Sequence, residues 1–141
     1  MLAGRISVRV GDRIDSGSVR WSRNANEETI GFYTPLGSQV AEFKRTAAGV
    51  SLIRGLDRQD SASVAELTEA LFGVAIDLDL LARLVQGADA LQTRWVSADG
   101  REWRLQAEEF SAAGPHRHAR RVSIESGDAR VRLVIDEWQA L

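Results

Sequence analysis

Hydrophobic and polar residues alternate along most of the chain, in short runs separated by turn residues. In the first run, Ile6, Val8 and Val10 alternate with Ser7 and Arg9, and this period of two is typical of a strand with one buried face. The same alternation recurs over the first part of the chain and predicts a meander of five short antiparallel strands. They contain Gly4 to Val10, Val19 and Trp21, Thr29 to Tyr33, Gln39 to Phe43, and Val50 and Leu52.

The period changes to that of a helix between residues 63 and 87. Ser63 lies three residues before Glu66, which is the spacing of a capping box, and Gly73 is well placed to end this first helix. Asp79 is expected to be the N-cap of a second helix, which Gly87 ends. Apolar residues recur at helical spacing in both: Leu67, Leu71 and Phe72, then Leu80, Leu81, Leu84 and Val85. Helices this short need a surface to pack against, and the apolar face of the sheet is the available one.

The period of two returns after the helices and predicts four more strands, which contain Trp95 and Val96, Trp103 to Ala107, Val122 and Ile124, and Val131 to Ile135. The predicted fold class is therefore mainly β with two short helices (α+β), in the order five strands, two helices, four strands. Most strands have one apolar and one polar face, so a single antiparallel sheet with one wet face is the economical arrangement. About nine twisted strands tend to curl, which gives the sheet a concave apolar side.

The two helices are expected to cover part of this concave side and to leave an apolar cavity. A closed barrel filled by its own side chains fits the same periodicity. If the cavity is present, we expect it to be lined by Val8, Val19, Trp21, Phe32, Phe43, Leu67, Leu71, Leu81 and Leu84.

A tight connection lies between the third and fourth predicted strands, at Tyr33-Thr34-Pro35-Leu36-Gly37-Ser38. Pro35 fixes φ and has no N–H to donate, while Gly37 permits a positive φ. Leu36 is held between them, at a position where turns usually carry polar residues. It either folds back onto the core or is held outward to contact something apolar.

The chain has 141 residues, 44% of them hydrophobic and 27% charged, which is ordinary for one folded domain spanning residues 1–141. Its net charge of −2 argues against a nucleic-acid binder, and the arginines near Trp21, Trp95 and Trp103 should point to the sheet face opposite the indole rings. There is no cysteine, so disulfides and thiol chemistry are excluded. No apolar run approaches the roughly 20 residues of a transmembrane helix.

Two histidines are the main candidates for a chemical site. His116 and His118 could be two metal ligands, but no carboxylate or cysteine accompanies them locally. A hydrolase that used either ring would need a nucleophile or a metal within hydrogen-bonding reach.

The carboxylates have simpler explanations than catalysis. Asp77 and Asp79 flank a helix start, where capping explains them. The pairs Glu27-Glu28 and Glu108-Glu109 are expected to be solvated charges. The sequence contains neither a glycine-rich phosphate loop nor a nucleophile elbow. We therefore predict a protein that is not an enzyme and that needs no metal or cofactor.

Three segments carry a resemblance to a known family. They are the opening run Leu2-Ala3-Gly4-Arg5-Ile6-Ser7-Val8, the turn Thr34-Pro35-Leu36-Gly37-Ser38 with the alternating residues after it, and the closing run Arg130-Val131-Arg132-Leu133-Val134-Ile135-Asp136-Glu137-Trp138. Two helical segments, Leu67 to Gly73 and Leu78 to Gly87, lie between them. In their order and spacing these pieces resemble the outer-membrane lipoprotein receptor LolB family over nearly the whole chain.

The resemblance implies a half-open barrel with helices over its concave face. It implies a cavity that accepts lipoprotein acyl chains from a LolA-like periplasmic carrier, and delivery into the inner leaflet of the outer membrane. Pro35, Leu36 and Gly37 match a protruding loop whose exposed leucine is needed for insertion. The family's lipidated N-terminal cysteine and the helical segment before the opening strand are not found in this sequence. We therefore expect this chain to be soluble, to act at the periplasmic face of the outer membrane, and to contact the membrane only transiently.

The alternative is a soluble, lipocalin-like carrier of a small apolar ligand. Such a carrier shares the cavity but has no membrane role and needs no exposed leucine. Exposure of Leu36 would therefore distinguish the two hypotheses.

Overall fold

The computed structural model describes residues 1–87, 93–97, 100–110 and 118–138. Within these residues, ten strands form one antiparallel sheet in the order β6-β5-β4-β3-β2-β1-β10-β9-β8-β7. The strands are β1 (Leu2–Val10), β2 (Arg13–Arg23), β3 (Glu27–Tyr33), β4 (Gln39–Thr46), β5 (Gly49–Arg54), β6 (Asp57–Ser61), β7 (Arg94–Val96), β8 (Glu102–Phe110), β9 (Ala119–Ser126) and β10 (Ala129–Trp138). Between β6 and β7 the described chain forms the helices α1 (Val64–Phe72) and α2 (Leu78–Gln86).

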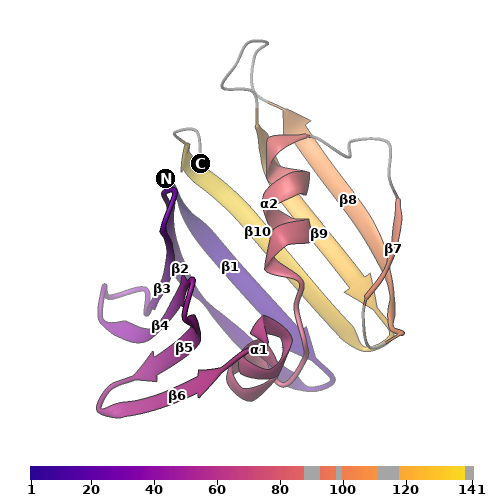
Figure 1. Ribbon diagram of the computed structural model, residues 1–141. Helices are drawn as coiled ribbons and strands as arrows, with labels where there is room; N and C mark the ends of the chain where they lie inside the picture. The colour runs from indigo at the N-terminus through magenta and orange to yellow at the C-terminus, as the bar shows by residue number, and fades with distance from the viewer. Residues whose placement is uncertain (88–92, 98–99, 111–117, 139–141) are drawn as a thin grey trace.

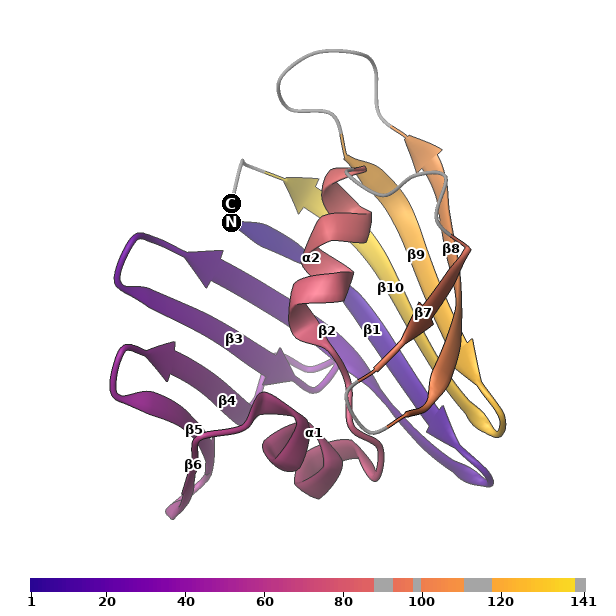
Figure 2. The same cartoon turned by 45° about the vertical axis from the view of Figure 1, so that its right-hand side comes forward.

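The sheet curves around the two helices, which lie over its concave face (Figures 1 and 2). Helix α1 contacts β5 and β6, and helix α2 contacts β8 and β9. Strand β1 pairs with β10, with Leu2 opposite Trp138, so the beginning of β1 and the end of β10 lie side by side. Strands β6 and β7 are the two edges of the described sheet and do not pair with each other. The architecture is therefore a half-open barrel, as expected, and not a closed one.

One strand was not predicted. Strand β6, with the sequence Asp-Arg-Gln-Asp-Ser, has no apolar residue, so hydrophobic alternation could not reveal it, and the prediction of nine strands was wrong. It pairs antiparallel with β5, from Val50 opposite Ser61 to Arg54 opposite Asp57. An edge strand forms backbone hydrogen bonds with a neighbouring strand on one side only. Charged side chains on such a strand discourage its free side from pairing with other molecules.

The helix ends follow the predicted chemistry, with one correction. Ser63 is the N-cap of α1, and its hydroxyl accepts a hydrogen bond from the backbone N–H of Glu66. Gly73 ends α1 with a φ of +82°, in the left-handed region that favours glycine. The N-cap of α2 is Asp77 and not Asp79, because the Asp77 carboxylate accepts from the Leu80 N–H at 3.0 Å. Asp79 instead lies in the first turn of α2.

The hydrophobic core lies between the concave face and the helices. Alternate strand residues such as Val8 and Val19 are buried in it, as the period of two predicted. Leu67 of α1 and Leu80 and Leu84 of α2 are each at most 1% exposed, so both helices bury their apolar faces against the sheet.

Candidate functional site

The nine residues predicted to line a cavity come together in the structure. Five lie on strands β1 to β4, two on α1 and two on α2, and each is at most 8% exposed. They are the concave-face residues Val8, Val19, Trp21, Phe32 and Phe43 and the helical residues Leu67, Leu71, Leu81 and Leu84. In this structure they pack against one another as part of the core. The apolar interior is therefore present, and the helices cover it.

An open pocket of about 210 Å³ lies where the C-terminal end of α1 meets β3 and β4. Its lining includes Phe32 and Leu71 from the predicted set, together with Tyr33, Val40 and Phe72. The rings of Phe32 and Phe72 meet edge to face, with centroids 5.3 Å apart and planes at 82°. Sites that enclose a drug-sized ligand have volumes of roughly 300–1,000 Å³. A long acyl chain therefore needs more room than this pocket offers.

A second pocket, of about 150 Å³, lies at the other end of α1, where this helix meets α2. Val64, Ile76 and Leu78 give it a largely apolar lining, and Arg45 and Asp79 lie at its polar side. Open space thus adjoins both ends of α1, while the middle of the helix is closed by Leu67.

The C-terminal end of α1 is held by a strand residue. Its last turn has no basic side chain of its own, and the guanidinium of Arg13 on β2 donates to the backbone carbonyl of Leu71 at 2.8 Å. A cation at this position also interacts favourably with the helix dipole. Arg13 therefore fixes the end of α1 that borders the 210 Å³ pocket.

The β3–β4 turn presents Leu36 to solvent. Thr34 N–H donates to the Ser38 carbonyl at 2.8 Å, and Gly37 N–H donates to the Thr34 carbonyl at 2.9 Å. Gly37 has a φ of +90°, which a larger residue adopts only with strain. Leu36 is 96% exposed, so it does not fold back onto the core. The turn adjoins the 210 Å³ pocket, because Tyr33 and Val40 on either side of the turn line that pocket.

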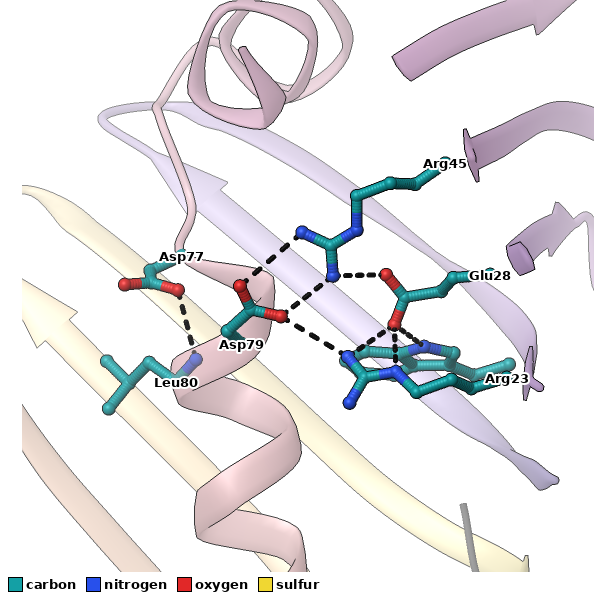
Figure 3. A network of polar contacts seen from close by, with 7 residues as sticks. Arg23, Glu28, Arg45, Asp77, Asp79 and Leu80 are labelled. Carbon is teal, nitrogen blue, oxygen red and sulfur yellow. Dashed lines mark hydrogen bonds and ion pairs between the residues drawn. The ribbon is translucent and has the colours of Figure 1, made fainter. Parts of the chain in front are cut away.

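A cluster of four charged residues joins α2 to the sheet; we call Arg23, Glu28, Arg45 and Asp79 the charged cluster (Figure 3). Arg45 of β4 donates to Asp79 of α2 with Nη2–Oδ1 at 2.7 Å and Nη1–Oδ2 at 3.4 Å. Arg23 of β2 reaches the same Asp79 Oδ1 at 3.2 Å. Both arginines also pair with Glu28 of β3. Three strands thus hold the first turn of α2 through one network.

Glu28 was expected to be a solvated charge, and this expectation was wrong. Its side chain is 6% exposed, and its Oε2 accepts from Trp21 Nε1 at 2.9 Å and from Arg23 Nε at 2.8 Å. Trp21 and Arg23 therefore lie on the same face of β2, so the expectation that tryptophan and arginine point to opposite faces was wrong for Arg23, although it holds for the exposed Arg20 beside Trp21. No short-range sequence signal reveals this, because the partners of Glu28 are set by strand register.

The network shifts the protonation equilibria of its two best-aligned members. The hydrogen bond from Arg45 holds the pKa of the Asp79 carboxyl below its ordinary value, against a smaller opposing effect of burial. The same hydrogen bond raises the pKa of the Arg45 guanidinium. Asp79 is therefore a carboxylate at neutral pH, and its side chain is still 59% exposed to water.

The other predicted candidates lie apart from this region. His116 is outside the described residues, and the ring of His118 stacks on Trp138 with centroids 5.2 Å apart. Glu108 and Glu109 are exposed, as expected. Among the described residues, no helix has the length and apolar character needed to cross a membrane.

The fold and the site define a half-open barrel with a helix-covered apolar interior and an aliphatic residue held out at one turn. The sequence profile of the family described as "Outer membrane lipoprotein LolB" matches residues 1–138. A relative named "Outer-membrane lipoprotein LolB" from Azoarcus sp. (strain BH72) is 30% identical, over 99% of this chain and 78% of the relative. Another relative of that name, from Nitrosomonas europaea, is 27% identical, over 99% of this chain and 72% of the relative. The crystal structure of Mycobacterium tuberculosis lipoprotein LppX gives a TM-score of 0.41 at 17% identity, over 100% of this chain and 88% of that one. The chain belongs to the LolB family, which confirms the resemblance found in its sequence.

Proposed function

We propose that this chain is a lipoprotein receptor, which accepts lipoprotein acyl chains from a LolA-like periplasmic carrier and passes them to the inner leaflet of the outer membrane. The observation that carries the proposal is Leu36, 96% exposed at a turn beside an apolar pocket, in a member of the LolB family. The relatives are named outer-membrane lipoprotein LolB, and this name supports lipoproteins as the class of cargo and the outer membrane as the membrane of delivery.

The physical requirement is that acyl chains never enter water. Each methylene exposed to water costs about 0.8 kcal/mol, so a long chain must pass directly between apolar surfaces. The 210 Å³ pocket and the β3–β4 turn adjoin through Tyr33 and Val40. An acyl chain that leaves the pocket at this point meets the bilayer where Leu36 enters it.

Leu36 acts by orienting the receptor and not by anchoring it. Burial of one leucine side chain contributes about 1.5–3 kcal/mol, which is too little to hold a protein on a membrane. Pro35 limits its own φ, and backbone hydrogen bonds from Thr34 to Ser38 and from Gly37 to Thr34 hold the turn, so little conformational freedom is lost when Leu36 enters the lipid. The contact is transient, and it places the mouth of the pocket against the bilayer.

Loading requires movement of the helices. The five concave-face residues and the four helical residues of the predicted set become the lining of the cavity when α1 and α2 move away from the sheet. The pockets at both ends of α1 give this movement a starting point, and the charged cluster holds α2 in the closed position. Transfer by this route breaks no covalent bond and needs no catalytic group.

The lipocalin-like carrier is the less well supported alternative. A soluble carrier gains nothing from an aliphatic residue in water, whereas a membrane-contacting receptor needs one. The exposure of Leu36 therefore favours the receptor over the carrier.

The test is a transfer assay with a fluorescent triacylated lipopeptide bound to the purified chain and vesicles of phosphatidylethanolamine and phosphatidylglycerol. Leu36→Glu is expected to leave folding and lipopeptide binding intact and to abolish transfer, because a carboxylate does not enter the acyl region. Ala25→Glu is the matched control, since Ala25 is also an exposed turn residue but lies at the opposite end of the sheet. Equal transfer by Leu36→Glu and the unmodified chain would refute the proposal.

A further inference from the structure

The exposed large hydrophobic residues gather at one end of the sheet. Because every strand pairs antiparallel with its neighbours in the sheet, the β1–β2, β3–β4, β5–β6, β7–β8 and β9–β10 connections share one end, which we call the tip end. Among the described residues, those exposed residues are Ile14, Leu36, Val40, Leu56 and Val96. All five lie in or within two residues of a connection at the tip end.

The opposite end has a different composition. The β2–β3 turn there is formed by Asn24-Ala25-Asn26, and the β4–β5 turn contains Ala47 and Ala48. Single exposed hydrophobic residues are normal on protein surfaces. Within the part of the chain that the structure describes, their restriction to one end of this sheet calls for a function of that end.

Leu56 is the least expected of the five. Three described hairpins have two-residue loops that begin with a glycine at a φ of about +60°: Gly11-Asp12, Gly55-Leu56 and Gly127-Asp128. The second loop residue is polar in two of them, as is usual in turns, and it is leucine in the third. Leu56 is fully exposed, with a relative accessibility of 106%, so it contributes nothing to the core. Folding therefore does not account for a leucine at this position.

We propose that Leu56 is a second membrane-inserting residue, which enters the acyl region of the bilayer together with Leu36. This inference rests on the proposed function, because it assumes that the tip end faces a membrane. Two leucines on separate hairpins define a direction across the tip end, so the chain approaches the bilayer in a fixed orientation. A single inserted leucine would leave the chain free to tilt about it.

A bilayer fits these tips better than a protein partner does. A protein interface needs a contiguous patch of about 800 Å² on each side, with a packed core. Leu56 stands alone, between Gly55 and the exposed Asp57, and Leu36 stands between Pro35 and Gly37. Isolated aliphatic side chains of this kind suit a fluid acyl phase, which closes around each one separately.

The charges beside Leu56 also define the expected lipid dependence. Arg54 and Asp57 flank the Gly55-Leu56 loop as opposite residues in the strand register, and their formal charges cancel, so the tip has no net charge. The contact is therefore made by the leucine and does not depend on anionic lipid. Vesicles of phosphatidylcholine and phosphatidylethanolamine are a sufficient target.

The test uses an environment-sensitive probe at single sites, which is straightforward because the chain has no cysteine. Leu56→Cys, Leu36→Cys and Ala25→Cys are each labelled with a nitrobenzoxadiazole dye, and the chain is tethered to the vesicles by a flexible N-terminal histidine tag. The dye is expected to become brighter and blue-shifted at positions 56 and 36, and to stay unchanged at position 25. A response at 36 without one at 56 overturns this inference and leaves the proposed function standing. No change in dye fluorescence at either position overturns both this inference and the proposed function.

Two further outcomes are also decisive. A response at all three positions means nonspecific adsorption and overturns the inference. A dye at position 56 that responds to a purified carrier protein but not to vesicles assigns Leu56 to a protein interface, which overturns it as well.

Unlabelled variants remove any effect of the dye itself. Leu56→Asn is expected to lower the vesicle partition coefficient of the untethered chain about tenfold or more, as loss of one inserted leucine requires. The double variant Leu56→Asn with Ala25→Leu keeps the number of exposed leucines but moves one to the opposite end, and it should not restore partitioning. Restored partitioning, or no loss in Leu56→Asn, contradicts the proposal. Unchanged thermal unfolding of both variants is the check on folding.

Discussion

Arg45 and Asp79, thirty-four residues apart in the sequence, are joined by two hydrogen bonds across the gap between sheet and helix, the shorter at 2.7 Å. Arg45 lies on β4, and Asp79 lies in the first turn of α2. The contact ties the beginning of the covering helix to the strand that follows the Leu36 turn. It therefore connects the two parts of the molecule that our proposal requires to act together, the cover of the apolar interior and the tip.

Weakening this contact should loosen α2. Asp79→Asn keeps the shape of the side chain but removes its charge, and we expect it to lower the free energy of unfolding by roughly 0.5–1 kcal/mol, as is typical of partly exposed pairs. Amide hydrogen exchange of α2 should become faster, and uptake of a lipopeptide should become faster with it. Exchange rates measured residue by residue report the first effect directly.

Asp136→Asn is the matched control for this change. Asp136 also pairs with an arginine, Arg5, at 3.2 Å, but this exposed pair joins two neighbouring strands and does not join a helix to the sheet. Its loss should leave the exchange of α2 unchanged. Equal acceleration of α2 exchange by both variants would show that the charged cluster has no special role in holding the helix.

The stability that Asp79 contributes should depend on pH. Its pKa is lower in the folded chain than in the unfolded chain, because the hydrogen bond from Arg45 favours the carboxylate. The contribution is therefore fully present above the unfolded pKa of about 4 and is lost as the pH falls through the folded pKa. The measurement is the difference in free energy of unfolding between the unmodified chain and Asp79→Asn, followed from about pH 7 to about pH 3. A difference that stays constant over this range would contradict the assignment.

Removal of Glu28 should be far more damaging than removal of Asp79. Glu28 is buried and balances Arg23 and Arg45, so Glu28→Ala leaves two cations close together and the Trp21 indole without its acceptor. Loss of one partner of a buried ion pair costs about 3–5 kcal/mol. Chemical denaturation measures this loss.

Glu27 provides the comparison on the same strand. Glu27 is half exposed and pairs with Lys44 at 3.6 Å. Glu27→Ala should therefore change the free energy of unfolding by less than about 0.5 kcal/mol. If the two variants lost similar stability, the buried network would not be the reason for the effect of Glu28→Ala.

Alternation and turn chemistry were sufficient to predict most of the fold and part of the site. The buried face of each apolar strand follows from residues such as Val8 and Trp21, and the tight turn follows from Pro35 and Gly37, whereas turn chemistry alone left open whether Leu36 points outward. These features depend on neighbours within a few positions in the chain. They are therefore visible without knowledge of the tertiary structure.

Features that depend on register or on helix placement were not predictable in this way. The burial of Glu28 depends on the pairing of β3 with β4, which places it beside Arg45, and on α2, which brings Asp79 to the same place. Strand β6 has no apolar residue to reveal it. The exposure of Leu56 could have been inferred by comparing its turn, Gly55-Leu56, with the turn Gly11-Asp12, in which aspartate follows the glycine. This comparison is possible only once β6 and its turn are known.

The 210 Å³ pocket should enlarge, and bind acyl chains better, when Phe72 is shortened. Phe72 lines this pocket and packs edge to face on Phe32, so Phe72→Ala is expected to lower the free energy of unfolding by about 3–5 kcal/mol and yet to raise the affinity for a fluorescent fatty acid. Leu105→Ala is the control, because Leu105 is buried on β8 and does not line the pocket. It should destabilise the chain without improving binding. If both variants bound the probe equally well, general loosening of the core, and not the space left by Phe72, would be the cause.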